Sequence, residues 1–538
     1  MPTSFNNLVK KLSAIANSFD ETNNLLKKEL LKSLSKLHLP KFKNLITYAE
    51  VLMFLRSHPA NETLLTLTDN ELKRISVFLK RNKEGFKKNY DGSGLPYSHI
   101  HTRFSHDLIH WLIEQKTYQL VLDSFADGDI DLSDILKLTL PAIERERTSS
   151  GFNKDELLQA LHLKPNQTLQ FIHQQLGMFN QQPLLKDYLF DGLEIYSKVS
   201  SNDLHFSRLY NRLQLQNVFF HEELIKKFDS LALLNSSLPA AKTLNDLENK
   251  ALVSVIKNSL ILTSRETDPC TYMEEKTLRL FELERGISVA IYGMNPERQL
   301  PLESYVGYTL FKNGYPAAYG GCWVFGQRSL FGINIFEPFR GGESGFMKCQ
   351  ILRVYRQVFG INYFEVEPYQ FGKDNPDGIA SGAFWFYHRY GFRPADKDIL
   401  KLSEKEHLKI KTIKGYRSSV RTLKQLAESH IGLTLGKYHQ LTVSQISEKV
   451  SAIIQKQYSG NRQVAIDDCI KIFLIKSNFQ KELNLHEQSV LEEMSLCAAA
   501  LKIEKIEQFD LLTKMIVAKP IDLYAYQNLL TRFLTVTN

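Results

Sequence analysis

Glycine and proline are scarce in this chain, with 27 and 17 residues among 538. Since 43% of the residues are hydrophobic and 11% aromatic, the composition excludes a disordered chain and a fibrous repeat. Cysteine is also rare, and the five cysteines lie far apart and form no C-x-x-C pair: Cys270, Cys322, Cys349, Cys469 and Cys497. An odd, scattered set argues against a disulfide framework and a zinc ribbon. We therefore expect a reducing, cytoplasmic location.

Long apolar runs are absent as well. The segment MPTSFNNLVKKLSAIANSFDETNN carries lysines in its middle and no apolar core of a secretion signal, and nowhere do about 18 uncharged apolar residues follow one another. We expect no secretion signal and no membrane partner. Charge of one sign is only mildly in excess, because 67 Lys and Arg against 59 Asp and Glu give +8. This excess permits an anionic partner without requiring one.

The chain is long enough for three to four domains at about 150 residues each. Near the amino end, apolar residues recur at steps of three and four, as at Phe5, Leu8 and Leu12, which indicates helices. Similar stripes predict a helical region of one or two subdomains over residues 1–245, ending in the linker-like NSSLPAAKTLND. Helical spacing returns after about residue 425, so residues 425–538 are predicted to form a second helical region.

Between these regions the period shortens toward two. The runs ISVAIYG, SYVGYTLFKNG, YPAAYGGCWVFG, LFGINIF and INYFEVE concentrate β-forming residues. Asn313-Gly314 separates two of the runs and predicts a tight hairpin, since both residues tolerate positive φ. Helical patterns follow in GFMKCQILRVYRQVFG and ASGAFWFYHRYG. We therefore predict the α+β class, with a mixed-sheet domain over residues 246–424.

A glycine-containing turn at Arg340–Gly345, RGGESG, connects a predicted strand to an amphipathic helix. Backbone N–H groups of such a turn, together with the helix N-terminus, favour an anionic group such as a pyrophosphate. Arg340 would add a bidentate contact. The turn lacks the Gly-Lys-Ser/Thr ending of nucleoside triphosphatases and the G-x-G-x-x-G spacing of dinucleotide folds, so neither class is expected. A purely structural tight turn is the competing interpretation.

About forty residues further on, residues 383–392 read AFWFYHRYGF. This segment resembles the A-x-x-F-Y-x-x-x-G-F signature of the GNAT superfamily of N-acetyltransferases. The preceding RGGESG resembles that family's acyl-CoA pyrophosphate loop, Q/R-x-x-G-x-G/A, and the two occur in the family's order. The resemblance covers roughly residues 285–400. It implies a GNAT-like sheet domain that uses acetyl-CoA or another acyl-CoA as co-substrate.

The resemblance also implies where the acyl-CoA lies. The strand ending around Ile335 to Glu337 would splay from the strand at 363–367, and the pantetheine arm would occupy the opening. A backbone N–H near Ile335 or Phe336 would polarise the thioester carbonyl. The diphosphate would be held by the turn, namely Arg340, Gly341, Gly342, Ser344 and Gly345.

Two catalytic roles follow from the same resemblance. Tyr387 matches the tyrosine that serves many members as general acid to the departing thiolate, although its aromatic neighbours also suit a core helix. A base must accept the amine's proton. Glu337, Glu365 and Glu367 are the carboxylates near the implied cleft, and Glu337 is the first choice. Each of these glutamates also fits a solvated strand position.

The chain departs from the family pattern at two places. Glu343 stands where the loop usually has glycine, and a like charge 4 Å from a phosphate costs about 4 kcal/mol at an effective dielectric constant near 20. We expect Glu343 to turn outward, where the helix dipole favours it. The stretch YQFGKDNPDGIASG is also longer than usual and would shape an acceptor pocket.

The leading hypothesis is an acyl-CoA-dependent N-acyltransferase acting on a small-molecule or peptide amine. The flanking helices would supply an acceptor site or a homodimer surface. One alternative is a GNAT-like binding or scaffold protein without turnover, which Glu343 favours. Another is a transferase of the same fold that uses aminoacyl-tRNA, for which the basic stretch over residues 409–424 is the sole hint. That stretch lacks interleaved aromatics, so nucleic acid is not favoured and a solvated basic face is the simpler interpretation.

His106 and His110 share i, i+4 spacing in HDLIH, as metal ligands do. The run lacks the glutamate of H-E-x-x-H, and no carboxylate follows at metalloprotease spacing. The aspartates of DGDIDLSD also fail the calcium-loop pattern, because Leu132 and Leu138 replace its glycine and its bidentate glutamate. We therefore predict structural histidines and no metal ligand.

Overall fold

The computed structural model describes residues 4–41, 43–82 and 90–537, which group into two compact units. The first unit comprises Met1–Leu224, Leu244–Tyr272 and Phe311–Pro316, and the second comprises Ile225–Thr243, Met273–Leu310 and Ala317–Asn538. This grouping differs from the three consecutive regions expected from the sequence. Residues 225–243 belong with the central sheet, and the C-terminal helices share its unit.

The first unit is mainly helical, as expected for residues 1–245, but it also holds a small sheet that the sequence analysis did not predict. Strands β1 (Ile100–Thr102), β3 (Ile195–Ser200) and β2 (Gln119–Phe125) form an antiparallel sheet in that order. Strands of three to seven residues are too short to establish a period of two against the helical stripes around them. The helices are α1 (Phe5–Ile15), α2 (Glu21–Ser35), α3 (Lys43–Ser57), α4 (Glu62–Arg81), α6 (His106–Glu114), α7 (Leu132–Thr139), α8 (Lys154–Ala160), α9 (Pro165–Leu176), α10 (Pro183–Gly192), α12 (Asp246–Ile261) and α13 (Asp268–Thr271).

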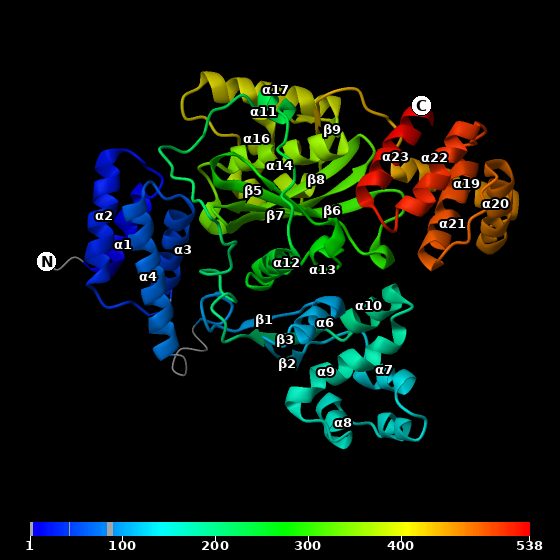
Figure 1. Cartoon of the computed structure of the whole chain (residues 1–538), viewed down its shortest axis with the longest axis horizontal. Coiled ribbons are helices and arrows are strands. Elements are labelled where there is room, and N and C mark those ends of the chain that lie inside the picture. Colours follow the sequence, from blue (N-terminus) through cyan, green and yellow to red (C-terminus); the bar gives the residue numbers. More distant parts are fainter. Residues whose placement is uncertain (1–3, 42, 83–89, 538) are drawn as a thin grey trace. The chain divides into compact units, whose positions relative to one another are not determined.

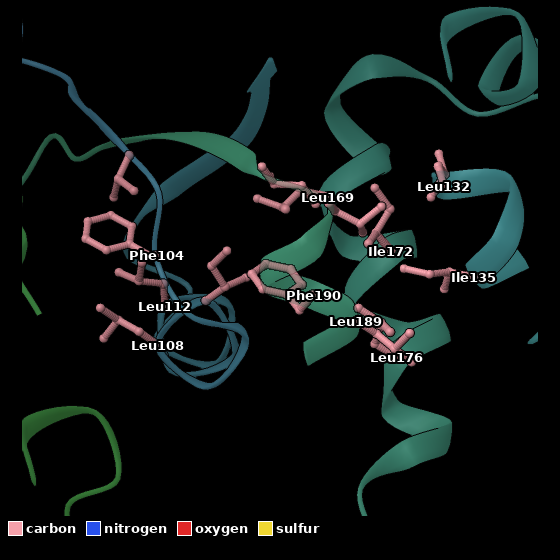
Figure 2. Packing of buried hydrophobic residues seen from close by; sticks show 14 of the residues in the cluster. Phe104, Leu108, Leu112, Leu132, Ile135, Leu169, Ile172, Leu176, Leu189 and Phe190 are labelled. Atoms are coloured by element: carbon pink, nitrogen blue, oxygen red, sulfur yellow. The ribbon is translucent and has the colours of Figure 1, made fainter. Parts of the chain in front are cut away.

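One core of the first unit lies where α6, α7, α9 and α10 meet the small sheet (Figure 2). In α9, Leu169, Ile172 and Leu176 lie three and four residues apart, so all three point to the same side of the helix. Phe190 of α10 packs into the same cluster. Each such side chain contributes about 1.5–3 kcal/mol when fully buried, so this cluster fixes the helices around the sheet.

The second unit is built on an eight-stranded sheet of order β10-β11-β9-β8-β7-β6-β5-β4. The five strands predicted between residues 285 and 370 are all present, and the mixed α+β class is confirmed. Strand β8 pairs antiparallel with β7 and parallel with β9, while β11 lies between β9 and β10. The strands are β4 (Arg279–Glu282), β5 (Ile287–Tyr292), β6 (Ser304–Lys312), β7 (Tyr315–Phe325), β8 (Arg328–Ile335), β9 (Tyr363–Val366), β10 (Arg393–Pro394) and β11 (Ile431–Thr434).

Helix α14 lies along one face of this sheet, with α11, α16 and α17 on the same side (Figure 1). Residues 225–243 pack against α14, because Arg353 donates to the carbonyls of Ser236 and Ser237 and Gln357 donates to that of Leu234. The polar composition of this segment is typical of linkers, but side chains of α14 donate hydrogen bonds to its backbone carbonyls and hold it against the helix. The helices of this unit are α11 (Ser230–Asn235), α14 (Ser344–Phe359), α15 (Pro376–Ser381), α16 (Ala383–His388), α17 (Lys397–Thr412), α18 (Val420–Leu426), α19 (Val443–Tyr458), α20 (Arg462–Ser477), α21 (Leu485–Ala500), α22 (Ile506–Ala518) and α23 (Leu523–Thr537).

The C-terminal helices α19–α23 form the predicted helical region, although residues 425–538 also supply strand β11. Their apolar core includes Leu302 and Phe325 beside the sheet. Tyr526 of α23 donates its hydroxyl proton to the carbonyl of Leu302 at 2.6 Å, and Gln527 donates to that of Val324 at 3.1 Å. These helices are therefore anchored to the sheet. Within the described ranges, no helix is both long enough and apolar enough to cross a bilayer.

The predicted hairpin turn is present between β6 and β7. Asn313 and Gly314 both have positive φ, +43° and +84°, as a two-residue type I′ turn requires. A Cβ built on Gly314 would lie 2.5 Å from the carbonyl oxygen of Leu213. The turn thus needs glycine for its backbone conformation and for the space around it.

Replacing Gly314 by alanine is expected to lower the free energy of unfolding by about 2–3 kcal/mol, measured by urea denaturation. Gly415 is the matched control, since its φ is +80° but a Cβ there meets nothing within 4 Å. Gly415→Ala should lose only about 1 kcal/mol, from backbone strain alone. Equal losses in the two variants would contradict the role of the Leu213 contact.

Candidate functional site

Strands β8 and β9 are paired at one end only. Their parallel ladder consists of Arg328↔Tyr363, Ser329↔Phe364 and Leu330↔Glu365. Beyond Leu330, β8 continues along β7 to Ile335 without a further ladder pair to β9. Residues 331–335 therefore have no strand partner on the β9 side, and we call this unpaired edge of β8 the opening.

The hydrogen-bond register of β7 and β8 determines which backbone groups face this opening. The Phe336 N–H donates to the carbonyl of Ala317 at 3.0 Å. Since bonded and non-bonded pairs alternate in an antiparallel ladder, Ala318↔Ile335 is a non-bonded pair. The Ile335 N–H therefore points away from β7, toward the opening. Of the two N–H donors considered from the sequence, that of Ile335 has the required direction. The Phe336 N–H is already bonded to Ala317, so the expectation that Phe336 could serve as the oxyanion donor is wrong.

The glycine turn after β8 has an unusual backbone. Gly341 and Gly342 both have positive φ, +81° and +50°, a region that costs other residues about 1 kcal/mol or more. Helix α14 starts at Ser344, whose N–H and hydroxyl both donate to the carbonyl of Gly341, at 2.9 and 2.7 Å. The N-cap residue Glu343 makes no side-chain hydrogen bond to the first turn. The turn leads directly into the N-terminus of α14, a place where backbone N–H groups can hold an anionic group.

Gly345 has a different role from its neighbours. A Cβ built there would lie 1.7 Å from the hydroxyl oxygen of Tyr390. Glycine is therefore required because the Tyr390 ring approaches the first turn of α14 closely. Phe228 stacks on Tyr390 with 5.6 Å between ring centroids and contacts Phe346 edge-on at 5.2 Å. Sequence analysis placed Tyr390 in the aromatic segment but did not relate it or Phe228 to the turn, because no spacing pattern connects them with it.

Arg340 lies between the opening and the turn. Its Nε donates to the carbonyl of Ile335 at 3.0 Å, and its side chain is exposed. Its remaining guanidinium nitrogens make no hydrogen bond to another of the residues that the structure describes. Arg340 is therefore fixed at the end of β8 with donors available to a ligand.

Glu343 is buried instead of turning outward, which corrects the expectation from the sequence. Its side chain is 1% exposed, and its Oε1 accepts from Arg285 Nε at 3.1 Å and from an Arg285 terminal nitrogen at 2.9 Å. The Ile225 N–H also donates to this oxygen, at 3.1 Å. A buried carboxylate needs such a partner because desolvation of an isolated charge is costly. The positive charge of Arg285 offsets the negative charge that seemed to oppose a diphosphate.

Tyr387 lies in α16 and is buried among aromatic rings. Its ring contacts those of Phe371, Phe386 and Phe392, with centroids 5.5–6.2 Å apart. Its hydroxyl makes no hydrogen bond to any described residue. Burial raises the pKa of the Tyr387 phenol above its usual range, so the hydroxyl keeps its proton at neutral pH. A protonated phenol is the form that a general acid needs.

The three candidate carboxylates differ in their surroundings. Glu365 is bound by Arg328 at 3.3 Å and by His430 at 3.4 Å, at the end of the sheet where β8 and β9 are still paired. These two ion pairs indicate a structural role for Glu365. Glu337 is exposed in the 3₁₀ turn Glu337–Phe339 directly after β8, and Glu367 is exposed directly after β9. Glu337 and Glu367 thus follow the two strands that border the opening.

The long stretch before the aromatic helix is structured. It forms the 3₁₀ turn Pro368–Phe371, followed by α15. The amide nitrogen of Gln370 lies 3.3 Å from a Cβ built on Gly332 of β8. This contact places Gln370 across the opening, a residue that sequence analysis did not single out.

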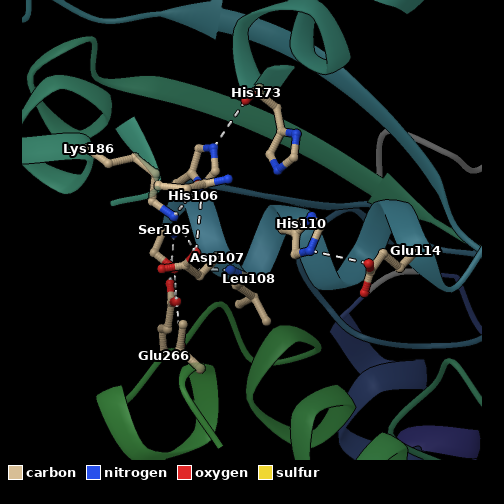
Figure 3. Close-up of polar contacts among 11 residues, drawn as sticks. Ser105, His106, Asp107, Leu108, His110, Glu114, His173, Lys186 and Glu266 are labelled. Atoms are coloured by element: carbon tan, nitrogen blue, oxygen red, sulfur yellow. Dashed lines mark hydrogen bonds and ion pairs between the residues drawn. The ribbon is translucent and has the colours of Figure 1, made fainter. Parts of the chain in front are cut away.

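The histidines of the first unit form a stacked group (Figure 3). The rings of His106 and His173 stack at 4.3 Å, and those of His110 and His173 at 5.2 Å. His106 donates through Nε2 to the carbonyl of His173 at 3.2 Å, while His110 pairs with Glu114 at 3.2 Å. Burial lowers the pKa of His173 to about 3, so this ring stays neutral. Among the described residues, no three His, Cys, Asp or Glu ligand atoms that include these rings converge closely enough for a metal ion.

The basic stretch after the aromatic helix is largely solvent-exposed. Lys409 pairs with the buried Glu406 at 2.7 Å, whereas Lys411, Lys414 and Arg417 are exposed. This pattern is typical of a solvated face.

Comparison with protein-family models, with curated proteins and with solved structures found no match for this chain.

Proposed function

We propose that the second unit is an acyl-CoA-dependent N-acyltransferase, with acetyl-CoA as donor and direct transfer to an amine. The observation that carries the proposal is the one-ended pairing of β8 and β9, with the Ile335 N–H directed into the opening. The turn at Gly341 and Gly342 follows immediately and leads into the N-terminus of α14. The resemblance to the GNAT superfamily implies a thioester site and a diphosphate site in this order.

The residues support the following sequence of events. The Ile335 N–H donates to the thioester carbonyl oxygen and stabilises the negative charge of the tetrahedral intermediate. The amine nitrogen forms the new C–N bond, and its proton passes to Glu337. The C–S bond then breaks, and Tyr387 supplies the proton that the departing thiolate takes up. The products are an amide and free coenzyme A.

Isothermal titration of the full chain with acetyl-CoA tests the proposal. We expect saturable heat with one site per chain, and competition by free coenzyme A. Absence of heat at millimolar acetyl-CoA would overturn the proposal and favour the scaffold hypothesis, because a protein without an acyl-CoA site should not bind either ligand.

Replacing Arg340 by alanine is expected to raise the dissociation constant of acetyl-CoA about 10-fold or more. The side chain offers charge-assisted hydrogen bonds to the diphosphate, each worth about 1.5–3 kcal/mol. At saturating acetyl-CoA, kcat should change little. Arg462→Ala is the matched control, since this exposed arginine starts α20. Unchanged affinity in Arg340→Ala would remove Arg340 from the site.

A further inference from the structure

Lys348 is a buried lysine that the proposed reaction does not use. It lies in α14, one turn after the glycine turn, and has no exposed surface. Its Nζ is 4.1 Å from the ring centroid of Phe386 and 4.2 Å from that of Tyr390. The centroids of Tyr387 and Phe392 lie 5.0 and 5.5 Å away. The ammonium group is therefore enclosed by four rings of the segment that carries the proposed general acid.

The side chain of Lys348 donates a hydrogen bond to the backbone at the carboxyl end of α16. The last carbonyls of a helix need donors from outside it. The Arg389, Tyr390 and Gly391 N–H groups donate to the carbonyls of Trp385, Tyr387 and His388, respectively. The remaining carbonyl, that of Phe386, accepts from Lys348 Nζ at 3.0 Å. A side chain of α14 thus supplies the missing hydrogen-bond donor at the carboxyl end of α16, next to Tyr387.

We propose that Lys348 is a positioning residue that fixes Tyr387 relative to α14, through its hydrogen bond to the Phe386 carbonyl and its four-ring cage. The catalytic part of this inference rests on the proposed acyltransferase function. Because α14 begins at the proposed diphosphate site and α16 carries the proposed acid, the contact sets the distance between the two ends of the acyl-CoA site.

Stability alone does not account for a lysine at this position. Burial lowers the pKa of Lys348 to about 7, with the positive charge of Arg389 acting in the same direction and Cys349 opposing it. Burying a cation is costly because its desolvation must be offset by new interactions, and an apolar side chain of similar length carries no such cost. Both protonation states of the amine can donate to the Phe386 carbonyl, so the hydrogen bond persists across neutral pH.

The test compares three variants of the full chain. Lys348→Met keeps the length of the side chain but removes the donor, and Lys348→Gln retains a neutral N–H donor. Lys519→Met is the control, since Lys519 is also buried in this unit but pairs with Glu493 in the C-terminal helices. We expect kcat to fall at least 10-fold in Lys348→Met, with the acetyl-CoA dissociation constant within threefold of wild type. Lys348→Gln should recover part of kcat, and Lys519→Met should leave it unchanged.

Hydrogen exchange without any ligand gives a second readout. In Lys348→Met, the amides of Arg389, Tyr390 and Gly391 should exchange at least 10-fold faster, because the end of α16 loses its anchor. The same amides should be unaffected in Lys519→Met. Unchanged exchange and unchanged kcat in Lys348→Met would overturn the inference. If wild type binds no acetyl-CoA, the proposed function fails, and the exchange result still decides whether Lys348 anchors α16.

Discussion

Replacing Tyr387 by phenylalanine is expected to lower kcat for acetyl transfer about 100-fold or more, while the acetyl-CoA dissociation constant stays within threefold. A positioned general acid contributes about 10²–10⁴-fold to a rate, and this variant removes only the proton that the thiolate needs. The ring contacts with Phe371 and Phe392 remain. Because the hydroxyl makes no hydrogen bond to a described residue, the free energy of unfolding should change by less than about 1 kcal/mol. Steady-state kinetics and urea denaturation measure the two quantities.

Tyr355 provides the matched control for a buried tyrosine in the same unit. Its hydroxyl donates to the carbonyl of Val306 at 2.7 Å. Tyr355→Phe should therefore destabilise the protein by about 1–3 kcal/mol, since a buried carbonyl loses its donor, and should leave kcat unchanged. Opposite effects of the two variants on rate and stability are the expected signature. Equal kcat in Tyr387→Phe and wild type would exclude Tyr387 as the acid.

The second large effect is expected from Arg285→Met. This variant removes two hydrogen bonds and the positive charge from a carboxylate that is 1% exposed. Breaking a buried ion pair by deleting one member costs about 3–5 kcal/mol. Without the positive charge of Arg285, the negative charge of Glu343 would also oppose a diphosphate at the neighbouring turn, by about 4 kcal/mol at 4 Å and an effective dielectric constant of 20. We expect both a loss of stability and at least a 100-fold weaker binding of acetyl-CoA.

A double variant separates the two consequences. Adding Glu343→Gln to Arg285→Met removes the negative charge, so acetyl-CoA binding should recover at least 10-fold relative to the single variant. Stability should recover only in part, because the amide still lacks the guanidinium donors. If Arg285→Met binds acetyl-CoA as tightly as wild type, the charge of Glu343 has no influence on the turn.

The sequence predicted those parts of the second unit that depend on local patterns. Period-two runs located five strands, the Asn313-Gly314 pair located a hairpin, and α14 starts within the glycine turn as expected. The hydrogen-bond direction at Ile335 was not predictable, because a one-residue change in register would exchange the roles of Ile335 and Phe336. The ion pair between Glu343 and Arg285 was also not predictable, because the two residues lie 58 positions apart and a local pattern does not encode a long-range ion pair.

In the first unit the same limit applies to the small sheet. Strand β3 alternates buried and half-buried residues, but its sequence IYSKVS is short and polar. Its pairing with β1, almost a hundred residues earlier, depends on tertiary contacts and not on local preference. Likewise, the composition of residues 235–246 is that of a linker, and the sequence gives no sign that Arg353 of α14 donates to the carbonyls of Ser236 and Ser237.

The distribution of the two units along the chain has a consequence for how this protein can be altered. The chain passes between the units after residues 224, 243, 272, 310 and 316. Cutting the chain at any one of these places would therefore divide at least one of the two units between two fragments. A fragment starting at residue 246, for example, would lack the carbonyls of Ser236 and Ser237 that Arg353 binds. Neither unit is one continuous segment, so replacing either one by another domain would require three separate exchanges of sequence.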